Sequence, residues 1–238
     1  MTPVSGKVTT ACSDELPALD EVLGRSTSHL SPLSDTVLLH AGTLPAFAEL
    51  RACGLERGID LAVASGYRSF ERQQLIWNAK ARGERAVLDD AGQSLDLAAL
   101  SERDRVFAIL RWSALPGASR HHWGTDMDIW DRAAVPGDYV LQLVPEEYAR
   151  GGPFAHLDAW LNSDEVAACG FFRPYREDRG GVAAEPWHLS HRPLARRFAR
   201  CLTRDQLAET LRRHPIELAD TVLAHLDEIY QRFVLCPA

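Results

Sequence analysis

The sequence predicts an α+β fold in which helices flank a small antiparallel sheet, followed by a helical C-terminal extension. Short strand candidates are separated by helical stretches without the regular strand–helix alternation of a parallel sheet. Beyond Pro193 every pattern indicates helix. The 238 residues are 46% hydrophobic and 25% charged, an ordinary globular composition with enough apolar material for a sizeable core.

In the first half of the chain, helix caps and one glycine mark the element boundaries. The hydroxyls of Ser69 and Ser101 can each accept from the free N–H groups of a first helical turn, and Asp104 completes a capping pattern after Ser101. Gly54 is a plausible end for the helix before it. We therefore expect an irregular arm with one short helix over 1–35, helices over 43–53, 69–81 and from 101 onward, a strand over 59–64, and a surface loop over 82–98.

In the second half, strand patterns give way to helices. From Thr125 polar and apolar residues alternate, which is typical of a strand. From Ile216 to Phe233 apolar residues recur in steps of three and four, as in an amphipathic helix. We therefore expect strands over 125–130 and 139–144, and helices over 156–169, 194–202, 204–213 and 216–234, the first of them broken near Asn162 and Ser163.

The domain prediction follows from these elements. We expect a catalytic domain over 1–191, with its core at about 40–191 and an N-terminal arm, and a helical extension over 192–238. An amphipathic final helix could dimerise, but such a face more often packs on its own domain, which we prefer. The sequence leaves monomer and dimer open.

Charge and cysteine usage narrow the function classes. The net charge of -7 disfavours a nucleic-acid binder. No stretch has the length and apolar character of a membrane span, and the first residues lack the apolar segment of a secretory signal, so we expect a cytoplasmic protein. Its cysteines are scattered without a CxxC pair and are interpreted as reduced, buried thiols: Cys12, Cys53, Cys169, Cys201 and Cys236.

Three segments concentrate the residues that could carry chemistry: 65–69 (SGYRS), 119–128 (SRHHWGTDMD) and 185–188 (EPWH). Two histidines and a carboxylate are a common set of three protein ligands for catalytic zinc, with the fourth position left for water. His121, Asp128 and His188 could be that set, although the adjacent His122 leaves open which ring faces a metal.

Two further residues fit a hydrolytic site. Glu185 lies three residues before His188, and Pro186 disfavours a regular strand there, so a bend could bring both side chains to one site. A carboxylate beside a metal-activated water is the usual general base for such hydrolysis. Arg68 follows a strand and could hold a carboxylate or a developing oxyanion.

The structural interpretations weigh against these functional ones. A single histidine is more often a structural side chain than a ligand, and Arg68 could simply pair with a surface carboxylate. Tryptophans in these segments are more typical of a core or a pocket wall. We apply the structural interpretation to His29, His40, His156, His214 and His225.

Taken together, the three segments resemble the VanY/VanX-type zinc D-Ala-D-Ala carboxypeptidases, the LAS metallopeptidases. This family includes vancomycin-resistance D,D-carboxypeptidases and dipeptidases, L,D-carboxypeptidases of peptidoglycan, and some phage endolysins. Its pattern is SxHxxGxAxD followed by ExxH, usually with a tryptophan before the histidine, and an upstream SGYRS segment with a downstream glutamine. The resemblance runs over about 59–191 and implies a small α+β domain whose antiparallel sheet carries the metal on one face.

The resemblance also implies roles for single residues. One Zn²⁺ ion would be bound by His121 rather than His122, with Asp128 and His188. Glu185 would be the catalytic base and Arg68 would stabilise the oxyanion. Ser119 would bind the terminal carboxylate of the substrate, and the remaining substrate-binding candidates are Tyr67, Gln73, Asp126 and Trp187.

Asp126 departs from the family pattern, which has alanine at that position. Its carboxylate could orient a ligand, contact a cationic group of the substrate, or replace Asp128 as the ligand. We favour Asp128 as the ligand, so the sequence predicts that Asp128→Ala abolishes zinc retention while Asp126→Ala does not.

These implied roles predict a bacterial zinc carboxypeptidase that releases a C-terminal D-amino acid, D-Ala, from peptidoglycan stem peptides or muropeptides. The motifs do not separate D,D from L,D specificity. An endolysin-like endopeptidase is one alternative, and a non-catalytic zinc-binding module on the same fold is another. Glu185 disfavours the binding module, because a structural zinc site needs no base and usually has four protein ligands.

Overall fold

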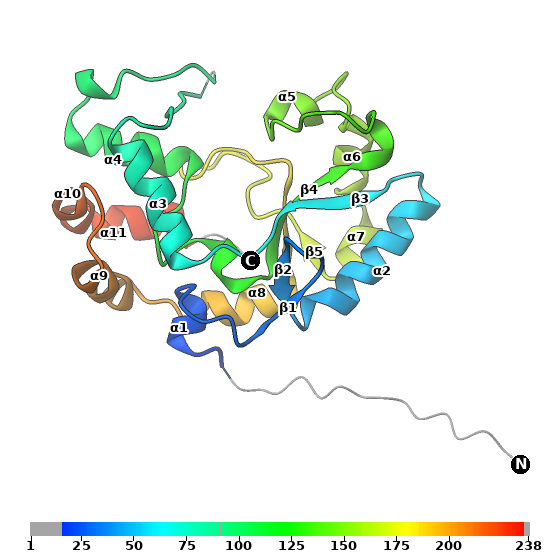
Figure 1. Ribbon diagram of the computed structural model, residues 1–238, viewed down its shortest axis with the longest axis horizontal. Helices are drawn as coiled ribbons and strands as arrows, with labels where there is room; N and C mark the ends of the chain where they lie inside the picture. Colours follow the sequence, from blue (N-terminus) through cyan, green and yellow to red (C-terminus); the bar gives the residue numbers. More distant parts are fainter. Residues whose placement is uncertain (1–15, 91, 236–238) are drawn as a thin grey trace, which may run out of the picture.

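The computed structural model describes residues 16–90 and 92–235 and has the expected α+β architecture (Figure 1). Its main sheet has four antiparallel strands in the order β3-β4-β6-β5, and a separate hairpin pairs β1 with β2. The strands are β1 (Leu30–Pro32), β2 (Leu38–His40), β3 (Leu61–Ser65), β4 (Asp126–Asp131), β5 (Phe171–Phe172) and β6 (His188–His191).

The helices gather in two groups. Figure 1 shows α3, α4 and α9 to α11 on one side of the strands, and α2, α6 and α7 on the other. Their bounds are α1 (Leu19–Val22), α2 (Thr43–Glu56), α3 (Phe70–Ala81), α4 (Glu102–Trp112), α5 (Pro145–Tyr148), α6 (Ala155–Trp160), α7 (Asp164–Ala168), α8 (Arg192–Ala199), α9 (Arg204–Arg213), α10 (Ala219–Ala224) and α11 (Leu226–Ile229). Single helical turns lie at η1 (Leu97–Ala99), η2 (Arg120–Trp123), η3 (Arg132–Ala134) and η4 (Tyr230–Val234).

Two hydrophobic clusters hold these groups together. In the first, Trp77 of α3 and Ile109 of α4 pack in one cluster with Leu207 and Leu226 of the C-terminal helices. The second joins the sheet to α2, α6 and α7. Because the first cluster mixes α3 and α4 with residues beyond 192, removing the C-terminal helices would expose apolar surface on both helices.

Several local predictions are confirmed. Ser69 accepts a hydrogen bond from the Arg72 N–H at 3.1 Å, and Ser101 accepts from the Asp104 N–H at 3.1 Å, so both cap helices as expected. The strand expected at 125–130 is β4. The helical stretch at 156–169 breaks where expected, because Ser163 caps α7 just after α6 ends.

The strand expected over 139–144 is wrong. The carboxylate of Glu147 accepts hydrogen bonds from the Gln142 N–H at 3.0 Å and from the Val144 N–H at 3.3 Å. Leu143 between them adopts a positive φ of 54°. A side chain therefore satisfies the backbone donors that a neighbouring strand would otherwise bind.

The single helix expected over 216–234 is also wrong, since Leu218 has a φ of 62° and the segment divides into α10, α11 and η4. Gly54 does not end α2, which continues to Glu56. The arm expected over 1–35 contains α1 as its short helix, but β1 begins at Leu30 and pairs with β2, which we did not predict.

Two other expectations concern the cysteines and membrane-spanning segments. Cys53, Cys169 and Cys201 are free thiols as expected, but each is half-buried and not buried, whereas Cys12 and Cys236 lie outside the described residues. Within residues 16–90 and 92–235, no helix combines the length and apolar character that crossing a bilayer requires.

Candidate metal centre

The register of the central strands brings two of the expected metal ligands together. β4 and β6 are antiparallel neighbours, and Asp128 is the cross-strand partner of His188. Side chains of directly opposed residues lie on the same face of a sheet, a few ångströms apart. Two residues along, Asp126 is opposite Ser190 and lies on the same face.

The third ligand, a histidine, comes from the turn that precedes β4. His121 lies in η2, which ends at Gly124 with a φ of +66°. A Cβ on Gly124 would lie 2.5 Å from Leu30 Cδ2 and 2.6 Å from the His40 backbone nitrogen, so only glycine fits. His121 Nδ1 donates to the Gly66 carbonyl at 2.8 Å, which leaves Nε2 free to face Asp128 Oδ2 at 3.5 Å.

These three side chains fit a metal ion. One ligand atom from each of His121, Asp128 and His188 lies within 4.8 Å of the others. A tetrahedral metal with bonds of roughly 2.0–2.1 Å needs donors about 3.3 Å apart, and Asp128 Oδ1 lies 3.3 Å from His188 Nδ1. Among the described residues, these two buried atoms have no hydrogen-bond partner. Buried polar atoms without partners are costly, so a cation between them would satisfy both.

Asp126 lies behind the cluster and not in the pocket lining. It is fully buried, and its carboxylate accepts from Arg120 Nε at 2.8 Å, Ser190 Oγ at 3.0 Å and His188 Nε2 at 3.1 Å. Burial opposes ionisation, but Arg120 and His188 hold the pKa of this carboxyl well below its usual range. Because Asp126 binds Nε2 of His188, the Nδ1 atom is the one that faces Asp128.

His122 points away from the cluster. Its Nε2 accepts from the Gly117 N–H at 3.0 Å, and its Nδ1 donates to the Arg68 carbonyl at 2.6 Å. Burial lowers the pKa of His122 to about 3, so the ring is neutral. Both ring nitrogens are therefore engaged in holding the loops on either side, whereas His121 faces the other two ligands.

Glu185 reaches the cluster through a turn and not through a strand. The His188 N–H donates to the Glu185 carbonyl at 3.1 Å, which closes the turn that contains Pro186. Glu185 Oε2 consequently lies 3.5 Å from His188 Nδ1. Burial raises the pKa of Glu185 to about 7, in the range that suits a general base near neutral pH.

Arg68 is held in the pocket by two side chains. Its Nη1 donates to Gln73 Oε1 at 3.0 Å and its Nη2 to Ser65 Oγ at 3.3 Å, while Gln73 Nε2 is anchored on the Ala114 carbonyl at 2.7 Å. Gln73 is fully buried and braces the guanidinium from behind. Tyr67 lies outside the pocket lining, and its hydroxyl donates to the Gly24 carbonyl.

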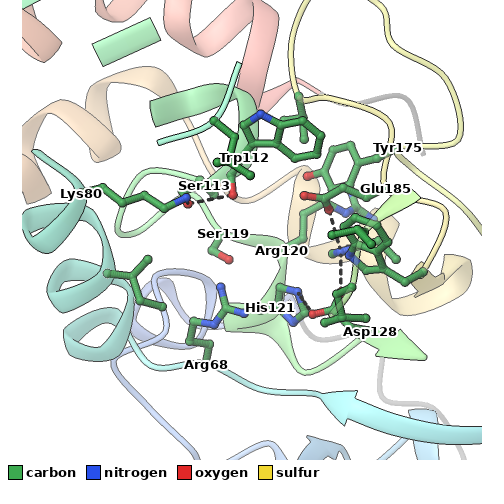
Figure 2. A pocket seen from close by; sticks show the side chains of 18 of the residues that line it. Arg68, Lys80, Trp112, Ser113, Ser119, Arg120, His121, Asp128, Tyr175 and Glu185 are labelled. Atoms are coloured by element: carbon green, nitrogen blue, oxygen red, sulfur yellow. Dashed lines mark hydrogen bonds and ion pairs between the residues drawn. The ribbon is translucent and has the colours of Figure 1, made fainter. Parts of the chain in front are cut away.

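One cavity of about 500 Å³ is lined by the three candidate metal ligands together with Arg68 and Glu185. Figure 2 shows Asp128 and Glu185 at one end of it, Lys80 at the other, and Ser119 between them. Ser119 and Trp187 line this cavity, and their contact with a substrate stays a prediction. The sequence analysis missed Lys80, Trp112 and Tyr175, which also line it. The spacing Gln73, Ile76, Lys80 on one helical face indicates which side of α3 points to the cavity and could have identified Lys80.

Comparisons with known proteins agree with this arrangement. The family model described as VanY: D-alanyl-D-alanine carboxypeptidase matches residues 36–194. Two uncharacterized proteins of Haemophilus influenzae are similar to the chain. One is 47% identical over 96 residues, which are 39% of this chain and 66% of the relative. The other is 33% identical over 123 residues, which are 51% of this chain and 93% of the relative.

Among solved structures, the chain is similar to VanYB in complex with D-alanine-D-alanine. The two share 22% sequence identity with a TM-score of 0.50, over 78% of this chain and 88% of that one. At this identity the likeness shows a common fold.

Proposed function

Since the chain belongs to the VanY D-alanyl-D-alanine carboxypeptidase family, we propose that it is a zinc-dependent carboxypeptidase releasing a C-terminal D-amino acid, D-Ala, from peptidoglycan stem peptides or muropeptides. The observation that carries the proposal is the buried His121, Asp128 and His188 cluster with Glu185 beside it in one cavity. Two histidines and one carboxylate leave a coordination position open, as hydrolytic zinc sites do.

The donor set favours one zinc ion, held by His121 Nε2, His188 Nδ1 and an Asp128 oxygen. A bound zinc ion supplies Lewis acidity to this end of the cavity. Asp126 fixes the ring of His188, and the Gly66 carbonyl fixes the ring of His121, so both rings present a lone pair to the same point. Imidazole and carboxylate donors together suit zinc better than calcium or magnesium, which prefer oxygen ligands alone.

Glu185 is the proposed general base. Its carboxylate takes a proton from the attacking water and delivers it to the amine of the departing D-amino acid. A pKa near 7 allows both transfers, because a carboxyl with that pKa gains and loses a proton readily at neutral pH. Trp112 and Trp187 line the same cavity and supply apolar surface to it.

Arg68 and Ser119 are the proposed substrate contacts. Arg68 presents a guanidinium already fixed by Gln73 and Ser65, so it can stabilise the oxyanion of the tetrahedral intermediate without reorganising. Ser119 lies between Arg68 and Lys80 in the cavity and is placed to donate to the terminal carboxylate of the peptide (Figure 2).

The deciding experiment is mass spectrometry of peptides incubated with the zinc-loaded protein, with and without a chelator. The panel contains a pentapeptide ending in D-Ala-D-Ala, a tetrapeptide ending in one D-Ala, and a cross-linked dimer. Chelator-sensitive loss of D-Ala from the pentapeptide alone identifies a D,D-carboxypeptidase. Loss from the tetrapeptide identifies an L,D-carboxypeptidase, and cleavage within the dimer identifies an endopeptidase.

Glu185→Gln is the matched control, because glutamine keeps the shape of the side chain and cannot act as the base. We expect it to bind one zinc per chain and to lose turnover. A parent protein that binds zinc and leaves all three peptides intact would instead support the non-catalytic binding module.

A further inference from the structure

Lys80 is a cation without an anionic partner in the catalytic cavity. It lies at the C-terminal end of α3, and its ammonium donates to Ser113 Oγ at 2.7 Å (Figure 2). The hydroxyl of Ser113 in turn donates to the Trp112 carbonyl. Among the described residues, no carboxylate lies within ion-pair distance of the Lys80 ammonium. The side chain is therefore held in place by a neutral group.

The surroundings of Lys80 make a charged ammonium without an anionic partner unfavourable in the free protein. Burial lowers the pKa of Lys80 to about 8, and the guanidinium of Arg85 contributes to that lowering. Arg85 lines the same cavity at its exposed rim, so a second positive charge acts on the Lys80 ammonium. A partly desolvated cation next to a second cation gains most from an anion that enters from outside.

The carboxylates of the cavity do not supply that anion. Asp128 lies among the metal ligands. The charge of Glu185 raises the pKa of Lys80 and that of Arg68 lowers it, but Glu185 is the proposed base at the opposite end, and among the described residues it forms no ion pair with Lys80. Arg120 also lines the cavity, but Asp126 neutralises it from behind. The end of the cavity away from the metal ligands thus carries the excess positive charge.

We propose that Lys80, with Arg85 at the rim, is a specificity residue that binds a carboxylate of the peptide substrate. The proposal rests on the proposed function, which makes a peptide the occupant of this cavity. Two carboxylates of a stem peptide have the required chemistry. One is the terminal carboxylate, and the other is the side-chain carboxylate of a diaminopimelate residue at the third position. A peptide with lysine at that position has no such side-chain carboxylate. Both carboxylates would form a charge-assisted hydrogen bond with the ammonium.

The test compares four peptides in which two features are varied independently. The third residue is diaminopimelate or lysine, and the C-terminus is a free acid or an amide. Dissociation constants are measured by calorimetry with zinc-loaded protein carrying Glu185→Gln, so that nothing is cleaved during the titration. Lys80→Met removes the charge and keeps the apolar stem, and Lys80→Arg keeps the charge. Arg72→Met is the matched control, because Arg72 is an exposed cation of the same helix outside the cavity.

We expect Lys80→Met to weaken binding roughly 10- to 100-fold for peptides that carry the recognised carboxylate, and to leave the others unchanged. Loss confined to free-acid peptides identifies the terminal carboxylate, and loss confined to diaminopimelate peptides identifies the side-chain carboxylate. Lys80→Arg should restore most of the affinity, and Arg72→Met should match the parent.

Equal loss for all four peptides, or no loss for any, overturns the proposal. Equal loss together with a lower melting temperature marks Lys80 as structural, whereas equal loss with an unchanged melting temperature marks it as a general support of the site. If the parent binds none of the peptides, the proposal and its substrate class both fail. Carboxylate-dependent binding by a parent that cleaves no peptide refutes the proposed function and leaves the role of Lys80 standing.

Discussion

Replacing Asp126 and Asp128 one at a time separates a residue that positions a metal ligand from the ligand itself. The two carboxylates lie on the same face of β4, and each contacts His188, Asp126 at Nε2 and Asp128 at Nδ1. Asparagine keeps the shape of each side chain and removes its charge. The contacts of the two residues predict opposite outcomes for metal retention and for stability.

Asp126→Asn should mainly destabilise the fold. Asp126 is fully buried and neutralises Arg120, whose Nε lies 2.8 Å from its carboxylate. Removing one partner of a buried ion pair typically costs about 3–5 kcal/mol. Arg120 would keep its bond to Ser190 Oγ and its position over the Trp123 ring, so we expect about 3 kcal/mol. For a chain of this length that corresponds to a fall in melting temperature of about 6–12 °C.

The same substitution should weaken zinc binding without abolishing it. Loss of the carboxylate that fixes a ligating histidine typically lowers metal affinity about 10- to 100-fold. Asp128→Asn removes a donor, so that variant should not retain stoichiometric zinc after desalting, and its metal-free form should melt closer to the parent than Asp126→Asn does. Elemental analysis of zinc content and chelator competition measure the effect of each substitution on metal binding. Thermal unfolding of the metal-free proteins measures its effect on stability.

Two patterns of results would refute this reasoning. If Asp126→Asn lost stoichiometric zinc while Asp128→Asn kept it, Asp126 would be the ligand and the assignment of the two carboxylates would have to be exchanged. If both variants matched the parent in zinc affinity, neither carboxylate would belong to the metal centre.

Three further predictions concern the pocket. Arg68→Lys should lower kcat about 100- to 1000-fold with unchanged zinc content, because lysine cannot reproduce the planar guanidinium braced by Gln73; a kcat close to that of the parent would contradict the role of Arg68. Gly124→Ala should destabilise the protein by at least about 1–2 kcal/mol in thermal unfolding, since its φ is +66° and its Cβ would meet backbone atoms; an unchanged melting temperature would contradict a left-handed turn at this position. The pKa of Lys80 is lowered to about 8 by burial and by Arg85, so its ammonium loses a proton as the pH rises through 8. The affinity for peptides that carry the recognised carboxylate should therefore fall above that pH in the parent and stay level in Lys80→Arg. An affinity that does not change with pH in either protein would contradict binding by the Lys80 ammonium.

Predictions from sequence were correct where structure depends on near neighbours. The caps at Ser69 and Ser101 involve N–H groups three residues away, so the sequence contains both partners. The strand β4 shows its alternation within six residues. Residue type suggested the metal-ligand candidates, the family resemblance chose His121 over His122, and the structure brings His121, Asp128 and His188 together.

Predictions failed where a side chain or an unusual backbone conformation competes with the hydrophobic pattern. The alternation at 139–144 is typical of a strand, but the Glu147 carboxylate takes its backbone donors. The helical period at 216–234 continues through Leu218, but its positive φ keeps residues 216–218 out of the helix, and the segment divides again at His225. The hairpin of β1 and β2 is too short to show a pattern at all. Each of these outcomes depends on side-chain competition or backbone strain that a hydrophobic period does not report.

The sequence by itself determined the donor types and the class of the fold. Only the tertiary structure decided that Asp128 meets Nδ1 of His188 while Asp126 holds Nε2 from behind, because that depends on the register between strands about sixty residues apart. It also placed Lys80 in the cavity, seven residues and two helical turns beyond Gln73. A sequence lists which groups are available, but which atom faces which is set by long-range packing and strand pairing, whose energies are spread over the whole fold.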